Sequence, residues 1–213
     1  MPTKKISNTN VPNAIFVDLD GVLRHWPTTD STVELNYNLP LDSIQKIAFE
    51  PTLLNLAIRG IITDDDWRSQ IVNKLLAEHP TSKAELAITE WSDSPGVIDT
   101  KLLNLLSICN SKNGISLVTN ATSRLDKDLE ALGLIKRFRA VVNSSDVGFI
   151  KPEPEIFQYA IQTCTCPANE ILFIDDSIEN VEAASNAGMM SHRYTGFAEC
   201  KDYLSKVGML CGA

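Results

Sequence analysis

Short apolar runs that end in polar residues recur along the chain, and amphipathic helical patterns separate most of them. The runs predict strands over 13–18, 115–120, 140–142, 171–176 and 189–194. Their apolar residues follow one another without polar alternation, which is typical of strands that are buried on both faces. From residue 99 onward the runs alternate with helical patterns. This order predicts an α/β fold with a doubly wound, mostly parallel sheet that is covered by helices on both faces.

The segment from 24 to 92 has a different character, because strand patterns are absent and helical signals follow one another. Pro40 and Pro51 each open a stretch with apolar residues on one side. Thr63 is the predicted N-cap of a helix whose first turn contains three aspartates, which we interpret as a solvated helix start rather than a metal site. Residues 82–85 have the residue types of a capping box and predict another helix start.

These patterns predict a discontinuous core that contains the helical segment as an insertion. The core is assigned to 12–23 and 93–210, and an all-helical cap is assigned to 24–92. Residues 1–11 are polar and are expected to form a mobile tail. A chain of 213 residues has the length of one large domain or of a domain with an insertion.

Two aspartates directly follow the first apolar run. If the chain stays extended to residue 20, the side chains of Asp18 and Asp20 leave the backbone on the same side. Two converging carboxylates repel each other unless a cation lies between them, and Mg2+ prefers oxygen ligands of this kind. Gly21 permits a sharp exit from the strand. The stretch indicates a metal-assisted acidic site, although the same D-x-D-G pattern also occurs in turns and calcium loops.

Other polar residues lie where predicted strands end. Right-handed crossovers bring the carboxyl ends of parallel strands to one edge of a sheet, where ligands bind in such folds. Lys151 lies between two of these strands, and Pro152 and Pro154 stiffen the backbone that presents it. The residues that this rule brings together with Lys151 are Asp18, Asp20, Thr119, Asn120, Asp175 and Asp176.

The overall charge restricts the partners of the protein. A net charge of -8 argues against nucleic acid or an anionic membrane surface as the main partner, but a bound metal can still create a site for a small anion. The first residues lack the apolar region of a signal peptide, and no apolar run approaches membrane-spanning length. The five cysteines have no zinc-type spacing. We expect a cytoplasmic protein that is a monomer or a homodimer.

Four motifs make the chain resemble the haloacid dehalogenase (HAD) superfamily, and within it the phosphatases with a helical cap. They occur in order and span nearly the whole chain apart from the predicted cap. The resemblance implies a HAD-like Rossmannoid core with an inserted all-helical cap. The motifs are D-x-D-G-V at 18–22, Thr119 at a strand end, Lys151 before Pro152, and the acidic pair Asp175 and Asp176.

The resemblance also implies catalytic roles. Asp18 would be the nucleophile that attacks phosphorus and forms an aspartyl-phosphate. Asp20 would protonate the leaving alkoxide and later deprotonate the attacking water. Thr119 and the Asn120 amide would hold phosphate oxygens, and Lys151 would offset the charge of the phosphate and the nucleophile.

The same resemblance implies Mg2+ as the cofactor. The ion would be held by the carboxylate of Asp18, the main-chain carbonyl of Asp20 and Asp176, while Asp175 would orient the ion or Lys151. The site therefore has four predicted acidic contributors around a dianionic phosphoryl group. Such a group of charges requires a divalent cation and a lysine.

The implied function is Mg2+-dependent hydrolysis of phosphomonoesters, with a small phosphorylated metabolite such as a sugar phosphate or a nucleotide-like monoester as the partner. A sugar phosphomutase shares all four motifs and stays an alternative. A 2-haloacid dehalogenase normally lacks the aspartate at position 20, so Asp20 argues against it. A phosphonate hydrolase requires a cap lysine, and Lys46 and Lys74 lie in no evident apolar pocket. A binding or scaffold protein that kept the fold without turnover is the alternative from another class.

The insertion follows the first motif directly, so the cap is placed to close over the site. Gly21 and the segment 92–96 would be the hinges. Arg24, His25 and Trp26 either contact the leaving group or pack the cap on the core, and the sequence leaves both readings open. Asn180 is expected to cap a helix or to form hydrogen bonds to site residues.

Overall fold

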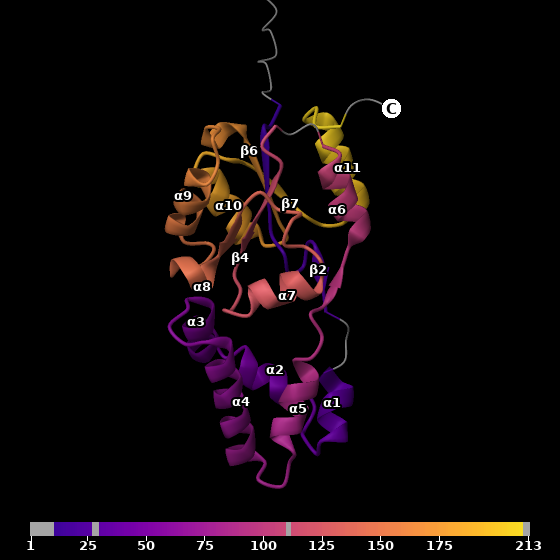
Figure 1. Cartoon of the computed structure of the whole chain (residues 1–213), viewed down its shortest axis with the longest axis vertical. Coiled ribbons are helices and arrows are strands. Elements are labelled where there is room, and N and C mark those ends of the chain that lie inside the picture. Colours follow the sequence, from indigo (N-terminus) through magenta and orange to yellow (C-terminus); the bar gives the residue numbers. More distant parts are fainter. Residues whose placement is uncertain (1–10, 27–29, 110–111, 211–213) are drawn as a thin grey trace, which may run out of the picture.

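The computed structural model describes residues 11–26, 30–109 and 112–210, and Figure 1 shows an α/β part and a helical part that lie end to end. Of the predicted tail over 1–11, only residue 11 is among the described residues. No helix in the described ranges is long and apolar enough to cross a membrane.

A five-stranded parallel sheet forms the centre of the α/β part. Its strand order is β5-β4-β1-β6-β7, and all neighbouring strands are parallel. The predicted strands and their parallel arrangement are confirmed, and no strand end differs from its predicted position by more than one residue. The strands are β1 (Ala14–Val17), β4 (Ile115–Thr119), β5 (Val141–Asn143), β6 (Ile171–Asp175) and β7 (Met190–Arg193).

Helices cover both faces of this sheet. On one face lie α6 (Thr100–Ser107) and α11 (Phe197–Lys206), and on the other lie α9 (Pro154–Gln162) and α10 (Ile178–Asn186). Two further helices, α7 (Leu125–Ala131) and α8 (Ser144–Val147), follow β4 and β5. A short 3-10 helix, Ala168–Glu170, precedes β6. The doubly wound α/β arrangement is therefore confirmed, while α11 had no predicted counterpart.

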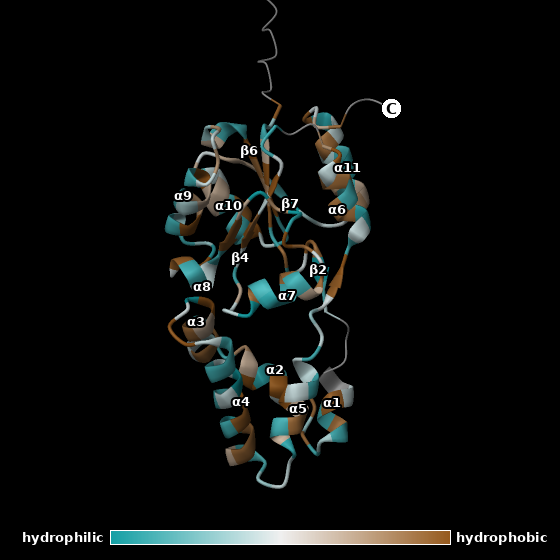
Figure 2. Ribbon diagram, in the orientation of Figure 1, coloured by the Kyte–Doolittle hydropathy of each residue, from teal (hydrophilic) through white to brown (hydrophobic). Residues whose placement is uncertain are grey.

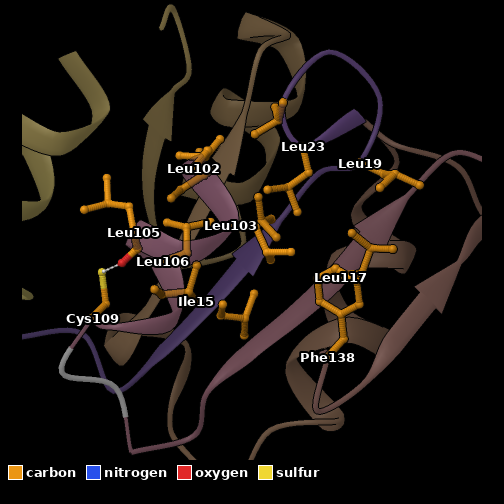
Figure 3. Packing of buried hydrophobic residues seen from close by; sticks show 14 of the residues in the cluster. Ile15, Leu19, Leu23, Leu102, Leu103, Leu105, Leu106, Cys109, Leu117 and Phe138 are labelled. Atoms are coloured by element: carbon orange, nitrogen blue, oxygen red, sulfur yellow. Dashed lines mark hydrogen bonds between the residues drawn. The ribbon is translucent and has the colours of Figure 1, made fainter. Parts of the chain in front are cut away.

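The central strand shows how the sheet joins two apolar clusters. Successive residues of β1 point to opposite faces, so Ile15 and Val17 belong to the cluster under α6 and α11, while Ala14 and Phe16 belong to the cluster under α9 and α10. Figure 3 shows Leu106 of α6 next to Ile15. Figure 2 shows hydrophobic central strands between helices in which hydrophobic and hydrophilic residues alternate. Burial on both faces explains why the strand residues are apolar without interruption.

The helical part is formed by five helices that share a separate apolar cluster. We call them the cap helices: α1 (Asp30–Asn36), α2 (Ser43–Ala48), α3 (Pro51–Ile58), α4 (Asp64–Glu78) and α5 (Ala84–Trp91). Their cluster contains Trp67, Ile71 and Leu75 from one face of α4. These residues repeat at four-residue intervals, as expected for one side of a helix.

The predicted N-cap at Thr63 is confirmed and is part of a capping box, whereas the capping box predicted at 82–85 is wrong. Thr63 Oγ1 accepts a hydrogen bond from the Asp66 backbone N–H at 3.1 Å, and the Asp66 carboxylate accepts one from the Thr63 N–H at 3.2 Å. The helix predicted from residues 82–85 begins after Lys83, whose side chain forms no capping hydrogen bond. The Lys83 N–H instead donates to the Tyr37 carbonyl at 3.1 Å, so a tertiary contact fixes this helix start.

A small antiparallel ribbon connects the two parts of the molecule. β2 (Arg24–His25) pairs with β3 (Val97–Ile98), so that Arg24 lies opposite Ile98 and His25 opposite Val97. The prediction that strands are absent from 24 onward is therefore wrong. Strands of two residues are too short to produce an alternating pattern in the sequence.

The cap helices also contact the α/β part away from this ribbon. Ser144 Oγ donates to the Ile58 carbonyl at 2.6 Å, and Arg59 pairs with Glu153. At Gly60, which has φ of +67°, an added Cβ atom would lie 2.0 Å from the Ser145 carbonyl oxygen. The end of α3 can approach α8 this closely only because this residue is glycine.

Replacing Ile71 by alanine is expected to destabilise the cap cluster by about 2–5 kcal/mol, because the change removes buried methyl groups and leaves a cavity. Urea unfolding followed by tryptophan fluorescence measures this loss, since Trp67 lies in the same cluster. The matched control is Leu86→Ala on α5, where the side chain is exposed and the expected change is within about 0.5 kcal/mol. Equal losses in the two variants would contradict the assignment of this cluster as a core.

Candidate active site

Three neighbouring strands end side by side at one edge of the sheet. β1 lies between β4 and β6, and both pairings are parallel. Asp18 directly follows β1, Thr119 ends β4, and Asp175 ends β6. The topology therefore brings together polar residues that lie as much as 157 positions apart in the sequence.

Lys151 joins two of these strand ends. Its Nζ atom lies 2.7 Å from Asp18 Oδ1 and 2.7 Å from Asp175 Oδ2. All three side chains are buried. One ammonium thus bridges two carboxylates, and it donates a charge-assisted hydrogen bond to Asp175.

The side chain of Asn120 holds the backbone of Lys151. Asn120 Oδ1 accepts from the Lys151 N–H at 2.8 Å, and Asn120 Nδ2 donates to the Lys151 carbonyl at 2.9 Å. This pair of hydrogen bonds fixes the point from which the lysine side chain extends. The sequence predicted Asn120 near the phosphate, but it gave no indication of this positioning contact.

Burial and charge act against each other at these groups. Burial raises the pKa of Asp18 to about 7, although the nearby Lys151 ammonium acts in the opposite direction. For Lys151, burial acts to lower the pKa, but Asp18 and Asp175 outweigh it and the pKa is raised. Lys151 is therefore a cation at neutral pH, and the site still has more negative than positive groups.

Three carboxylates lie close enough to share a cation. Oxygen atoms of Asp18, Asp175 and Asp176 lie within 4.8 Å of one another. Asp175 is held from the protein side, because its Oδ1 accepts from the Ser177 N–H at 2.9 Å and from Asn180 Nδ2 at 3.0 Å. Asp176 is exposed. The predicted hydrogen bond from Asn180 to a site residue is thus present.

Gly21 makes room for one of these carboxylates. It has φ of +87°, and a Cβ atom added there would lie 2.4 Å from Asp176 Oδ2. Any side chain at this position would displace the Asp176 carboxylate or strain the backbone. The sequence predicted the sharp turn at Gly21 but not this close approach to a residue of another strand end.

Thr119 has a buried hydroxyl that lacks a partner within the described part of the chain. The residue is 1% exposed, and its Oγ1 forms no hydrogen bond to any described residue. An unpaired buried hydroxyl costs free energy, so such a group calls for an explanation. Its place beside the carboxyl end of β1 suits an oxygen atom of a bound ligand.

The two aspartates of the first motif have different side-chain partners. β1 ends at Val17, and the Asp18 carboxylate turns back to accept from the Leu19 N–H at 2.7 Å. Asp18 faces Lys151, whereas Asp20 faces Arg24.

Among the described residues, three donor atoms surround the carboxylate of Asp20. Its Oδ1 accepts from Arg24 Nε at 2.7 Å and from Trp26 Nε1 at 2.8 Å, and its Oδ2 accepts from Arg24 Nη2 at 2.8 Å. Of the two readings of Arg24, contact with a leaving group is disfavoured, because the residue is 3% exposed. Trp26 is 49% exposed and His25 is also exposed, so both can meet a ligand.

A cavity of about 620 Å3 lies between the cap helices and α7, and its lining includes Asp128 and Pro95, which accept hydrogen bonds from Arg24. Arg68, Glu85, Arg124 and Lys127 belong to its lining. None of the site residues predicted from the sequence belongs to the described residues that line it. The arrangement of charges at the strand ends, rather than this cavity, therefore marks the candidate site.

Two known proteins are similar in sequence to this chain. Sesquiterpene phosphatase astK from Aspergillus oryzae is 27% identical over 207 residues, which cover 94% of this chain and 98% of that protein. Bifunctional epoxide hydrolase 2 from Rattus norvegicus is 34% identical over 74 residues, or 35% of this chain, but the match spans only 13% of that protein's length.

A similar fold occurs in a crystal structure of a HAD family enzyme from Bacteroides thetaiotaomicron in complex with magnesium and inorganic phosphate. The TM-score is 0.64 at 22% sequence identity, and the match covers 85% of this chain and 93% of that one. A family model described as haloacid dehalogenase-like hydrolase matches residues 30–193, which is most of the sequence. The chain therefore belongs to the haloacid dehalogenase-like hydrolase family.

Proposed function

We propose that the protein is a Mg2+-dependent phosphatase that hydrolyses small phosphomonoesters through an aspartyl-phosphate on Asp18. The observation that carries the proposal is the buried contact between Asp18 and Lys151. A carboxylate beside a buried ammonium is suited to attack an anionic phosphoryl group, since the ammonium offsets the charge of both. The phosphatase among the similar proteins supports the same reaction class.

The reaction takes place in two displacements. In the first, a carboxylate oxygen of Asp18 forms a bond to phosphorus, the bond from phosphorus to the leaving oxygen breaks, and Asp20 gives its proton to that oxygen. In the second, water attacks the same phosphorus and gives a proton to Asp20, so that inorganic phosphate leaves and Asp18 is again a carboxylate. Asp20 therefore acts once as an acid and once as a base.

Thr119, Asn120 and Lys151 are assigned to the phosphoryl oxygens. The unpaired Thr119 hydroxyl supports this role, because a phosphoryl oxygen would give it a partner. For Asn120 we assign the backbone N–H, since the side-chain amide is already engaged with Lys151. The Lys151 ammonium would face the same oxygens from between Asp18 and Asp175.

The carboxylates fit Mg2+, which prefers oxygen ligands. We assign the Asp18 carboxylate, the main-chain carbonyl of Asp20 and the Asp176 carboxylate to the ion. Asp175 is fully buried and accepts hydrogen bonds on both oxygens, which supports a role in orienting Lys151 and not in direct ligation. When bound, Mg2+ supplies positive charge that neutralises the phosphoryl group in the transition state.

The other family reactions have less support. Asp20 argues against a 2-haloacid dehalogenase, which has no leaving alkoxide to protonate. Lys46 and Lys74 are exposed on the cap helices, which argues against a phosphonate hydrolase with a cap lysine in an apolar pocket. A sugar phosphomutase uses the same groups and is distinguished by its product, an isomerised phosphate ester without net release of phosphate.

Replacing Asp18 by asparagine is expected to lower phosphate release by more than about 10³-fold, because the amide cannot attack phosphorus. The assay measures inorganic phosphate from a panel that includes a sugar phosphate, a nucleoside monophosphate and a prenyl phosphate. The matched control is Asp126→Asn, an exposed acid on α7, which is expected to keep full activity. Undiminished turnover in Asp18→Asn would contradict the mechanism. A fully folded wild-type protein without turnover on any member would favour the scaffold reading.

Replacing Asp176 by asparagine is expected to weaken Mg2+ binding by about 10–100-fold, because the ion loses a charged ligand. Isothermal titration of Mg2+ into the protein without substrate measures this change. Asp65→Asn is the matched control, since Asp65 is an exposed acid in the first turn of α4 and should leave Mg2+ affinity unchanged. A loss of Mg2+ affinity in Asp65→Asn alone would indicate that the metal site lies on the cap helices. Full activity of the wild type in the presence of a chelator would contradict the role of Mg2+.

A further inference from the structure

We propose that Arg24 is a positioning residue that fixes the carboxylate of Asp20 for proton transfer, and that Asp128 anchors Arg24 from the α/β part. This inference rests on the proposed function, in which Asp20 is the acid and base. It adds two residues that lie outside the four sequence motifs.

The contact between Arg24 and Asp20 sets the plane of the carboxylate. Two parallel hydrogen bonds join Nε to Oδ1 at 2.7 Å and Nη2 to Oδ2 at 2.8 Å. A guanidinium is flat and rigid, so a contact with both oxygens fixes the rotation of the carboxylate as well as its distance. A lysine at this position would supply charge without this orientation.

The donors around Asp20 distinguish its two oxygens. Oδ1 accepts from Arg24 and from Trp26, whereas Oδ2 accepts from Arg24 alone among the described residues. Each carboxylate oxygen has about two positions for a donor, so the described residues fill both positions on Oδ1 and one on Oδ2. We assign Oδ2 to the transferred proton: it gives the proton to the leaving oxygen as the bond to phosphorus breaks, and it takes a proton from water in the second displacement.

Arg24 is anchored independently of Asp20. Its Nη1 donates to Asp128 Oδ2 at 3.0 Å and to the Pro95 carbonyl at 3.4 Å. Asp128 in turn accepts from Arg124 Nε at 2.8 Å on its other oxygen. The guanidinium is therefore held by α7 and by the return segment from the cap helices, and it keeps a carboxylate partner whatever the position of Asp20.

The surroundings restrict the Arg24 side chain further. The guanidinium carbon lies 4.5 Å from the centre of the Trp26 ring, and a Cβ atom added at Gly96 would lie 2.8 Å from Arg24 Cγ and Cδ. A buried, crowded arginine cannot reach a substrate, so we infer that Arg24 acts on the reaction through its contact with Asp20.

The experiment compares two substrates that differ in their need for a proton. An alkyl phosphate leaves as a strongly basic alkoxide and needs the acid, whereas 4-nitrophenyl phosphate leaves as a stable phenolate. We compare kcat/KM, which reports the first displacement and is not affected by the second displacement that both substrates share. Replacing Arg24 by glutamine is expected to lower kcat/KM about 10²-fold for the alkyl phosphate and less than about 3-fold for the aryl phosphate.

Four further variants make the result specific. Arg24→Lys is expected to recover only part of the alkyl activity, and Trp26→Phe, at an exposed position, to lose a few-fold on the alkyl substrate alone. Should Arg24→Gln fail to fold because Asp128 loses a partner, the double variant Arg24→Gln with Asp128→Asn removes that buried charge. The matched control is Arg124→Gln, which also loses a contact to Asp128 but does not touch Asp20. In this variant the ratio of kcat/KM for the alkyl phosphate to kcat/KM for the aryl phosphate should stay within about 2-fold of the wild-type ratio.

Equal losses on both substrates in Arg24→Gln, or no loss on the alkyl phosphate, would overturn the inference, since a merely structural arginine affects both substrates alike. Asp20→Asn separates this failure from a failure of the proposed function. If Asp20→Asn lowers kcat/KM more for the alkyl phosphate than for the aryl phosphate and Arg24→Gln does not, only the inference about Arg24 is wrong. If Asp20→Asn also lowers kcat/KM equally for the two substrates, the assignment of Asp20 as the acid is wrong.

Discussion

The buried ammonium of Lys151 is the charge on which the whole strand-end arrangement depends. Without it, two carboxylates on adjacent strands would face each other in a site that excludes water, at a cost of several kcal/mol. Much of the nearby structure serves this contact. Asn120 holds the lysine backbone, and Ser177 and Asn180 hold the opposite side of Asp175. The positions of these residues follow from the need to keep one cation between two anions.

The sequence predicts the parts of the fold that have periodic or compositional signals. Mostly apolar runs marked β1, β4, β5 and β6 within one residue, and β7, which contains Ser191, His192 and Arg193, was also marked within one residue. Parallel topology then placed Asp18, Thr119 and Asp175 together. The direction of the Asp20 side chain was not predictable in this way. The Asp20 carboxylate is held by side-chain contacts with Arg24 and Trp26, which no periodic pattern indicates.

Contacts between distant residues leave no local signal. Arg24 and Asp128 are 104 positions apart, and nothing at either position indicates the other. The capping predictions illustrate the same limit. Thr63 and Asp66 cap each other locally, and their pattern was interpreted correctly. The start of α5 is held by the Tyr37 carbonyl from the turn after α1, so a local rule assigned it wrongly.

The β2–β3 ribbon has a consequence for how the chain can vary. His25 and Val97 are direct partners in an antiparallel pair, so the chain leaves the α/β part and returns to it at neighbouring points. The cap helices also have an apolar cluster of their own. Everything between the two partners is therefore a module whose ends already have hairpin geometry, and a two-residue turn could close the gap. Duplication, replacement or loss of this module would leave the register of the parallel sheet unchanged, so the same strand-end chemistry can be combined with a different cover.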